Sequence, residues 1–454
     1  MIRKLYSRWM NRWETALTTR DENRVVRPLE WGFEWLDDFI DAAGLGGAVE
    51  RAERDRIAAE DAMIAVNEAI VRGSEAFFGY ERPNDFRLEE RAPLLFPTNV
   101  RPETLRREAA LKRAMAEGKL RKAQFLRFTS PVRTAYPEND MVNARWYPAA
   151  DHPTTPKAGV SGAPGTRGRM QGKPRQAIIV MPQWNADAFS HNILCSLFNR
   201  FGISALRLSK PFHDIRRPAE IERSDYAVSS NIGRTIAAGR QAVVDVRCCL
   251  DWLEAQGYEQ FGILGTSLGS CYAFIASAHD ARLRVNAFNH ASMAFGDVVW
   301  TGQSTRHIRT AFAQAGMKRE LLYRLYSAIS PVSYMDRFAE HAKKVLVIHA
   351  RYDLTFLPEY SEQVLDSFTK HGVDFVSKVL PCGHYTTGEF PYKFIDGWYI
   401  GSFVYTAFRD LARDKAQTAA SGAETKDEEM VEAPGSGFQM DGGHGERGRV
   451  CERK

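Results

Sequence analysis

A serine between two glycines is the feature of this sequence that points most directly to chemistry. Ser267 lies in the segment Gly265-Thr266-Ser267-Leu268-Gly269, after an apolar run typical of a strand and before one typical of a helix. In so tight a turn, side chains two residues before and after the serine would collide, and glycine removes them. The turn would strain the backbone of Ser267 and hold its hydroxyl near the helix amides. We therefore predict that Ser267 is a nucleophile; the alternative is a plain glycine-flanked turn.

Asp353 and His384 are the candidates for the acid and the base that such a serine needs, since a hydroxyl is a poor nucleophile until a base removes its proton. Asp353 lies in the loop after the apolar run KVLVIHA, and His384 lies in the loop after VDFVSKVLP. Parallel strands end at the same edge of a sheet, so both loops can meet beside Ser267. The carboxylate would fix the imidazole tautomer while the ring accepts the serine proton. Turn and helix-capping roles remain the alternative for both residues.

Backbone amides are expected to stabilise the oxyanion that forms during acyl transfer, because this stabilisation is usually the largest single contribution to catalysis. The amide of Leu268 is the first candidate. The loop after the apolar run AIIVM supplies the second, which is the amide of Gln183 or of Trp184. The ring of Trp184 is expected either to form a wall of the acyl pocket or to pack in the core.

The periodicity of the sequence predicts the elements that must position these residues. Residues 1–123 read as an N-terminal helical extension, with apolar positions three and four apart. Residues 124–414 open with a two-stranded hairpin and continue as short apolar runs separated by helical patterns, which is typical of a parallel sheet covered on both faces. Residues 151–175 predict an exposed loop inside this domain, and residues 415–454 predict a disordered tail. The apolar runs are AIIVMP, ISALRLS, QFGILG, RVNAFNH, KVLVIHA and VDFVSKVLP.

The turn GTSLGS, the acid loop ARYDLTFLP and the histidine loop PCGHY resemble the α/β-hydrolase superfamily over about residues 124–412. The resemblance implies an α/β fold with a mostly parallel sheet, helices on both faces and the chain order serine, acid, histidine. It also implies that the helical insertion at about residues 291–340 is a lid over the pocket. The segments KPFHDIRRP and DWLEAQGYEQFGILGTSLGS are similar to the branch of the eighteenth abhydrolase-domain-containing protein.

Composition limits the partners of the chain. The 454 residues are 44% apolar and 26% charged, the balance of an ordinary globular protein, and the net charge is only +5. No basic stripe interleaved with aromatic residues stands out, so we expect no nucleic-acid partner. No apolar run is long enough to cross a bilayer and no secretory signal opens the sequence, which predicts a cytoplasmic protein. The six sparse cysteines predict free thiols, and we expect no metal and no cofactor.

Two further features leave alternatives open. The first helix places Leu5, Trp9 and Trp13 on one face among basic residues, so it could lie on an anionic membrane surface; packing on the protein's own body is favoured. Arg216 and Arg217 follow the run ISALRLS on the same sheet edge as the serine. They could bind an anionic part of the substrate, although a solvated surface pair is favoured.

The expected function is hydrolysis of a small-molecule carboxylic ester or thioester through an acyl-enzyme formed on Ser267. Acyl transfer to another alcohol or amine uses the same three side chains and differs in whether water reaches the intermediate. A serine peptidase of the same fold is another alternative. A non-catalytic scaffold that keeps the fold for binding is the alternative from a different class. No oligomeric state is predicted.

Overall fold

The computed structural model describes residues 2–52, 55–149 and 174–431. The chain divides into two compact units, residues 1–409 and residues 410–454. The first unit contains the sheet and the candidate site. The last helix, α16, continues past residue 414, where the predicted tail begins, and ends at Val431. The remainder of that tail, and all but the last two residues of the predicted loop 151–175, lie outside the described residues.

A nine-stranded sheet forms the centre of the first unit, in the order β1-β2-β3-β5-β4-β6-β7-β8-β9. Strands β1, β2, β3 and β5 pair antiparallel in turn, and every pair from β5 to β9 is parallel. The predicted hairpin is the pair β2 and β3, and each predicted apolar run is a strand. The strands are β1 (Arg87–Arg91), β2 (Ala123–Thr129), β3 (Met141–Tyr147), β4 (Gln176–Met181), β5 (Ser204–Ser209), β6 (Gln260–Thr266), β7 (Leu283–Asn289), β8 (Lys344–Ala350) and β9 (Phe375–Leu380).

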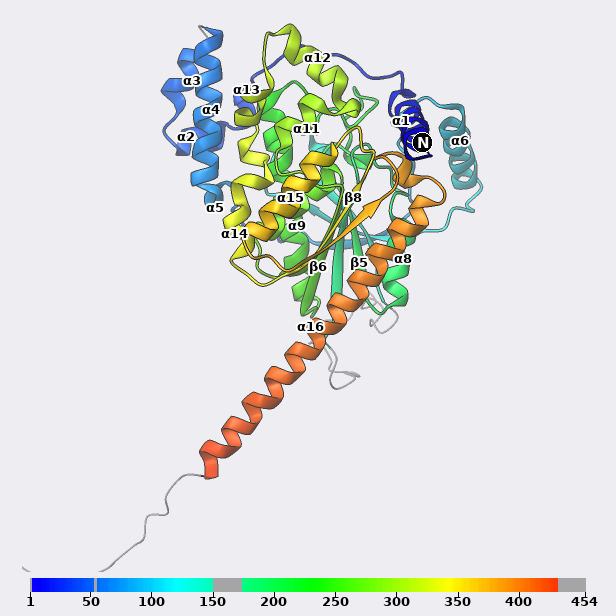
Figure 1. The fold of residues 1–454 in the computed structure, drawn as a ribbon, viewed down its shortest axis with the longest axis vertical. Coiled ribbons are helices and arrows are strands. Elements are labelled where there is room, and N and C mark those ends of the chain that lie inside the picture. Colours follow the sequence, from blue (N-terminus) through cyan, green and yellow to red (C-terminus); the bar gives the residue numbers. More distant parts are fainter. Residues whose placement is uncertain (1, 53–54, 150–173, 432–454) are drawn as a thin grey trace, which may run out of the picture. The chain divides into compact units, whose positions relative to one another are not determined.

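Helices flank this sheet (Figure 1). Consecutive residues of β4, β5 and β6 are buried, which requires cover on both faces because successive side chains of a strand point to opposite faces. The predicted α/β fold is therefore confirmed. The helices are α1 (Ile2–Thr19), α2 (Asp37–Ala42), α3 (Gly46–Ala52), α4 (Arg56–Arg72), α5 (Ser74–Phe77), α6 (Pro102–Ala116), α7 (Pro137–Asp140), α8 (Asn192–Arg200), α9 (Ile232–Ala255), α10 (Leu268–Ala278), α11 (Phe295–Thr301), α12 (Arg306–Gln314), α13 (Arg319–Leu325), α14 (Met335–Ala339), α15 (Pro358–Lys370) and α16 (Tyr392–Val431).

The N-terminal extension contains a strand as well as helices. The sequence predicted only helices there and missed β1, because its residues, RLEER, are mostly charged and show no alternation of apolar and polar positions. Figure 1 shows α2, α3 and α4 at one side of the first unit and α1 and α6 at the other. Helices on both of these sides contact the body. The side chain of Asn67 in α4 accepts a hydrogen bond from the amide of Ala328, and that of Glu14 in α1 accepts from the amide of Tyr385.

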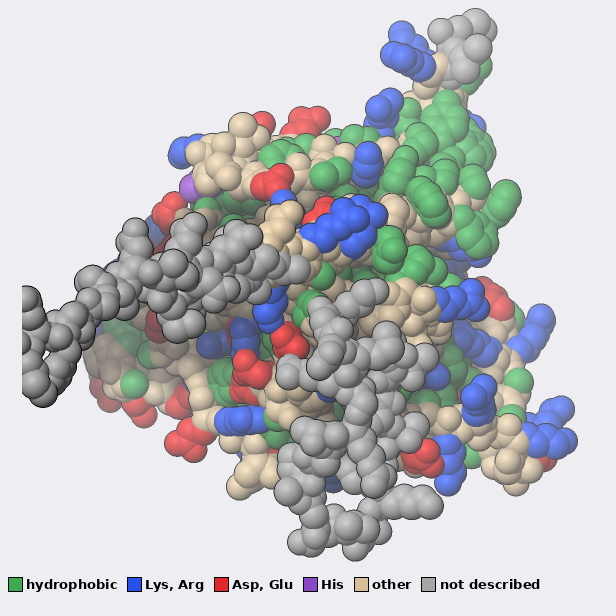
Figure 2. Space-filling view, turned by 90° about the horizontal axis from the view of Figure 1, so that it is seen from below, with side chains coloured by type: hydrophobic (Ala, Val, Ile, Leu, Met, Phe, Trp, Pro, Cys, Tyr) green, Lys and Arg blue, Asp and Glu red, His purple; other side chains and the backbone are tan. Residues whose placement is uncertain are grey.

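Helix α1 packs on the protein's own body, but not through the apolar face for which the sequence favoured such packing. The buried face carries Met10, Glu14 and Thr18, whereas Leu5 and Trp9 of the apolar face are 54% and 50% exposed. Figure 2 shows hydrophobic side chains gathered on one face of the molecule. The exposed large hydrophobic side chains include those of Leu5, Trp9, Phe390, Phe394 and Trp398. Within the described residues, no helix combines the length and the apolar character that a membrane crossing requires.

Short helices fill the insertion between β7 and β8. Helices α11, α12, α13 and α14 lie between Asn289 and Lys344, where the sequence predicted a helical insertion. Helix α11 contacts α12 and α13, and α14 contacts α10, the helix that follows the serine turn. The insertion therefore reaches the helix that begins directly after Ser267.

Candidate active site

Three loops at the carboxyl edge of the sheet bring Ser267, Asp353 and His384 together. Ser267 follows β6, Asp353 follows β8 and His384 follows β9; β6, β7, β8 and β9 are neighbours in the sheet. The Oγ of Ser267 lies 2.9 Å from Nε2 of His384, and Nδ1 of His384 lies 2.9 Å from Oδ2 of Asp353. The three side chains that the sequence singled out thus form one continuous hydrogen-bond chain.

The turn that carries Ser267 has the strain that its glycines suggested. Ser267 has φ 55° and ψ −121°, a conformation that L-residues rarely adopt, and α10 begins at the next residue. A Cβ at Gly265 would clash with the carbonyl oxygen of Gly269, and one at Gly269 would clash with that of Met181. Both glycines are therefore required by close backbone contacts. The contact between Gly269 and Met181 also places the serine turn directly against the end of β4.

Asp353 is held on both of its oxygens. Its Oδ1 accepts hydrogen bonds from the amides of Thr355 and Phe356 at 2.8 and 2.7 Å, and its Oδ2 accepts from the imidazole of His384. Burial raises the pKa of this carboxyl. The two imidazoles beside it lower the pKa by more than burial raises it, so the net direction is downward. Burial lowers the pKa of His384, and the charge of Asp353 more than offsets this, so that the pKa of His384 is raised. The pair therefore favours an ionised acid next to a basic imidazole.

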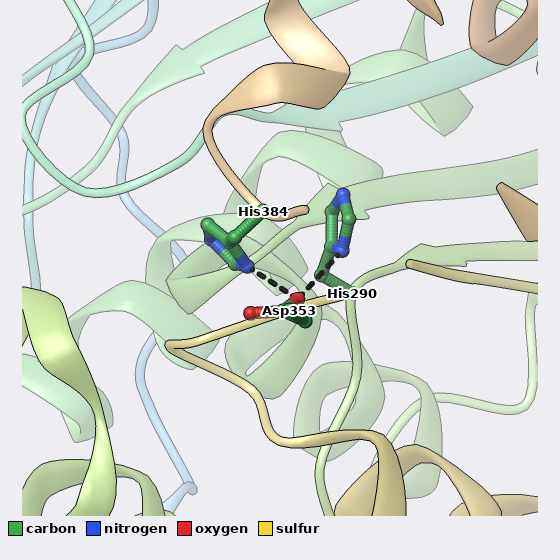
Figure 3. A group of neighbouring side chains, drawn as sticks. All are labelled: His290, Asp353 and His384. Carbon is green, nitrogen blue, oxygen red and sulfur yellow. Dashed lines mark hydrogen bonds and ion pairs between the residues drawn. The ribbon is translucent and has the colours of Figure 1, made fainter. Parts of the chain in front are cut away.

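A second histidine, which was not among the residues predicted from the sequence, contacts the same carboxylate. Nδ1 of His290, directly after β7, lies 3.1 Å from Oδ2 of Asp353, and both imidazoles face this oxygen (Figure 3). The rings of His290 and His384 have centroids 4.5 Å apart. Burial and the neighbouring His384 lower the pKa of His290. The available signal was its place: a histidine at the carboxyl end of a strand that lies between the strands of Ser267 and Asp353.

The side chains of His290, Asp353 and His384 offer atoms that could bind a metal ion, and these atoms lie within 4.8 Å of one another. Metal ions accept these donor types, but each imidazole nitrogen needs its lone pair free to bind one. In this geometry both Nδ1 atoms donate hydrogen bonds directly to Oδ2 of Asp353. The two Nδ1 atoms and the carboxylate oxygen thus bind one another, which matches a hydrogen-bonded chain better than a metal centre.

The loop after β4 is held by a buried lysine. Nζ of Lys210 donates to the carbonyl oxygens of Pro182 and Gln183 at 2.7 and 2.9 Å. In a trans peptide the amide points opposite to the preceding carbonyl, so the amides of Gln183 and Trp184 point away from Lys210. The side chain of Lys210 is almost fully buried, and burial sets its pKa well below the ordinary value. Lys210 directly follows β5 and opens the segment KPFHDIRRP, whose pattern did not by itself indicate this role.

An apolar pocket opens beside Ser267. It has about 490 Å³ of empty space, its open mouth included, and no charged side chain occurs among its described lining residues. The ring of Trp184 lines this pocket, stacks on His307 with ring planes 4° apart and also packs against the main hydrophobic core, so both interpretations of this residue stay open. The lining residues are Trp184, Val228, Ser267, Leu268, Cys271, Ser292, Phe295, Val298, Val299, Ser304, Thr305, Thr355 and Phe356.

Arg216 and Arg217 do not reach this pocket, so the hypothesis that they bind an anionic part of the substrate is wrong. The favoured surface pair is also wrong for Arg216, which is fully buried and pairs with Asp245 at 2.8 Å. Arg217 donates to the carbonyl oxygens of Pro97 and Glu222. Both guanidinium groups therefore hold backbone and core groups in place. The five cysteines among the described residues are free and buried, as their spacing suggested.

The strand order and the serine turn after β6 are those of the α/β-hydrolase fold. Residues 188–333 match the model of the family described as alpha/beta hydrolase domain containing 18. This segment runs from the loop after β4 through the serine turn and most of the helical insertion. The match confirms the resemblance to the superfamily and to this branch. No curated protein matches the chain.

Solved structures resemble the fold at low sequence identity. The acetyl xylan esterase from Paenibacillus sp. R4 is 11% identical, with 73% of this chain and 92% of that chain covered and a TM-score of 0.46. Acetyl xylan esterase 1 from Thermoanaerobacterium sp. JW/SL YS485 is 13% identical, with 74% and 93% covered and a TM-score of 0.47. The acylaminoacyl peptidase of Pyrococcus horikoshii is 12% identical, with 64% and 42% covered and a TM-score of 0.44. Likenesses at this level carry no conclusion about activity.

Proposed function

We propose that this chain is a serine hydrolase that cleaves a carboxylic ester or thioester through an acyl-enzyme intermediate. The observation that carries the proposal is the hydrogen-bond chain from Ser267 through His384 to Asp353, at 2.9 Å for each step. In this proposal Ser267 is the nucleophile, His384 is the general base and Asp353 orients the imidazole. The raised pKa of His384 supports its role, because a stronger base takes the serine proton more readily.

The reaction proceeds in two halves. Oγ of Ser267 bonds to the acyl carbon while its proton passes to Nε2 of His384, and the resulting imidazolium is stabilised by Asp353. The tetrahedral intermediate collapses when His384 returns the proton to the leaving alcohol or thiol, which leaves an acyl ester on Ser267. Water then attacks that ester, with His384 again as base, and the carboxylic acid leaves with Ser267 restored.

Two amides form the oxyanion site in this proposal. The amide of Leu268 is at the start of α10, where the helix dipole favours negative charge. The contact between Gly269 and Met181 brings the loop after β4 against this turn, and Lys210 directs the amides of Gln183 and Trp184 away from itself. One of these two amides is the second donor.

The apolar pocket favours an uncharged acyl group. Its walls carry aliphatic and aromatic side chains together with a few hydroxyl groups, and the insertion between β7 and β8 contributes Phe295, Val298 and Val299. An apolar acyl chain gains from burial there, whereas a carboxylate or ammonium would lose its hydration without a charged partner. The substrate is therefore an ester or thioester with a hydrocarbon acyl chain, and the insertion acts as the lid that limits its size.

Covalent labelling with a fluorophosphonate tests the proposal. The wild-type chain should be labelled on Ser267, and Ser267→Ala should remove both the label and the hydrolysis of p-nitrophenyl esters, with a loss in kcat of about 10⁶-fold. A folded wild-type chain that takes up no label would refute the proposal and favour a non-catalytic scaffold. A labelled chain that makes amides or new esters faster than free acid, when amine or alcohol acceptors are added, would identify an acyltransferase.

A further inference from the structure

The first helix reaches into the candidate site through a buried carboxylate. Glu14 of α1 has no measurable exposure, and it lies 370 residues before His384 in the chain. Its Oε1 accepts a hydrogen bond from the amide of Tyr385 at 2.8 Å, and its Oε2 accepts from the amide of Thr386 at 2.9 Å. Both amides belong to the loop that carries His384, directly after the imidazole. Glu14 therefore spans the two peptide groups that follow the proposed base.

Other contacts of α1 secure the same loop. The hydroxyl of Tyr6 donates to the carbonyl oxygen of Pro381 at 2.5 Å, just before His384. A Cβ at Gly383 would lie 2.5 Å from Oε2 of Glu14, so glycine is needed at this position for the carboxylate to fit. The glycine that precedes His384 thus has a specific physical reason, since its missing side chain leaves space for a residue from the other end of the chain.

We infer that Glu14 is a positioning residue for the proposed reaction, which holds the His384 loop so that the imidazole reaches Ser267. The inference rests on the proposed function. Glu14 does not line the pocket beside Ser267, and its carboxylate bonds to backbone amides of the loop rather than to reacting atoms. Its action is through the loop: two fixed amides set the position of the peptide on the C-terminal side of His384. A displacement of about 1 Å in a reacting group can lower a rate about 100-fold.

The charge of Glu14 adds an electrostatic effect on His384. The groups that face the imidazole are Asp353, His290 and Glu14, and the two carboxylates raise the pKa of His384 while burial lowers it. Burial raises the pKa of Glu14 by more than its two amide donors lower it, so the net direction is upward. The ionised form is the one in which both oxygens accept fully from the loop amides, and in that form its charge acts on the base together with the loop.

Substitution of Glu14 in the full-length chain tests this role. Glu14→Ala should lower both kcat for p-nitrophenyl esters and the rate of fluorophosphonate labelling of Ser267 by about 100-fold, with little change in KM. Glu14→Gln keeps one acceptor oxygen and removes the charge. It should lose less activity, and the acid limb of its kcat/KM profile should move to lower pH because the pKa of His384 falls.

Thr18→Val is the matched control on the same buried face of α1. Thr18 bonds to the side chain of Gln303 at 2.7 Å and has no hydrogen bond to the His384 loop. Its removal should lower the melting temperature without changing kcat. If Thr18→Val reduced the labelling rate as much as Glu14→Ala does, the effect would be that of loosened helix packing, and the inference would be wrong.

A double-mutant cycle with Gly383 sharpens the test. Gly383→Ala should reduce the labelling rate in the wild-type background by displacing the carboxylate, and should have a much smaller effect in Glu14→Ala, where no carboxylate is left to displace. Labelling of Glu14→Ala at the wild-type rate would overturn the inference while the proposed function stands. An unlabelled wild-type chain would instead overturn the proposed function and this inference with it.

Discussion

Two regions of the molecule meet at His384, and they differ in how they come to be there. The loops after β6, β8 and β9 supply the side chains that would carry the reaction, and neighbouring parallel strands bring them to one edge of the sheet. Helix α1 comes from the other end of the chain and contributes hydrogen bonds to the backbone of the histidine loop. The comparison indicates that the sheet supplies the reacting groups, while a docked helix sets how firmly one of them is held.

Replacement of Asp353 should lower kcat much more than replacement of Glu14 does. In Asp353→Asn the side-chain amide can donate a hydrogen bond to Nδ1 of His384, whereas the carboxylate can only accept one. The wrong tautomer of His384 would then face Ser267. The expected loss in kcat is about 10⁴-fold, well above the loss expected for Glu14→Ala. Steady-state kinetics of both variants, with melting temperatures as a check on folding, measure the difference. Equal losses would mean that the helix is as important as the orienting acid.

The pH profile should show which histidine is the base. Below the pKa of the base, kcat/KM should fall about tenfold per pH unit because the imidazole is protonated. The pKa of His384 is raised from its ordinary value of 6.5 and that of His290 is lowered from the same value, so the acid limb should lie above pH 6.5.

The control for this profile is His290→Phe, which removes the second imidazole but leaves the proposed base. The variant should retain an acid limb above pH 6.5, whereas His384→Phe should abolish turnover. An acid limb of the wild type well below pH 6.5, lost in His290→Phe, would instead assign the base to His290.

The smallest expected effect is on selectivity, where the two regions should behave differently. Burial of each added methylene of the acyl chain contributes about 0.8 kcal/mol of binding free energy. For p-nitrophenyl esters, kcat/KM should therefore rise about fourfold per methylene until the pocket is full. Glu14→Gln should lower the whole series without changing this ratio, because α1 does not line the pocket. Trp184→Ala, which removes a pocket wall, should change the ratio. A changed ratio in Glu14→Gln would place α1 in substrate binding.

The sequence was most informative where local patterns determine local structure. Each apolar run was a strand; β4 and β5 are buried on both faces and therefore need consecutive apolar residues, whereas the edge strand β9 is mostly exposed. Ser267, Asp353 and His384 could be singled out because each follows such a strand. The edge strand β1 could not be found in this way, since its charged residues face solvent and its pairing with β2 depends on a neighbour outside its own sequence.

The sequence by itself determined the order of the strands from β2 to β9, the glycine-flanked serine and the two loops that follow β8 and β9. Only the tertiary structure decided that His290 shares the carboxylate of Asp353, that Lys210 holds the loop after β4 and that Glu14 accepts from the amides after His384. The physical reason is that strand and turn patterns act between residues close in the chain. These three contacts join residues that are 28 to 371 positions apart and that meet only after the sheet and α1 have packed.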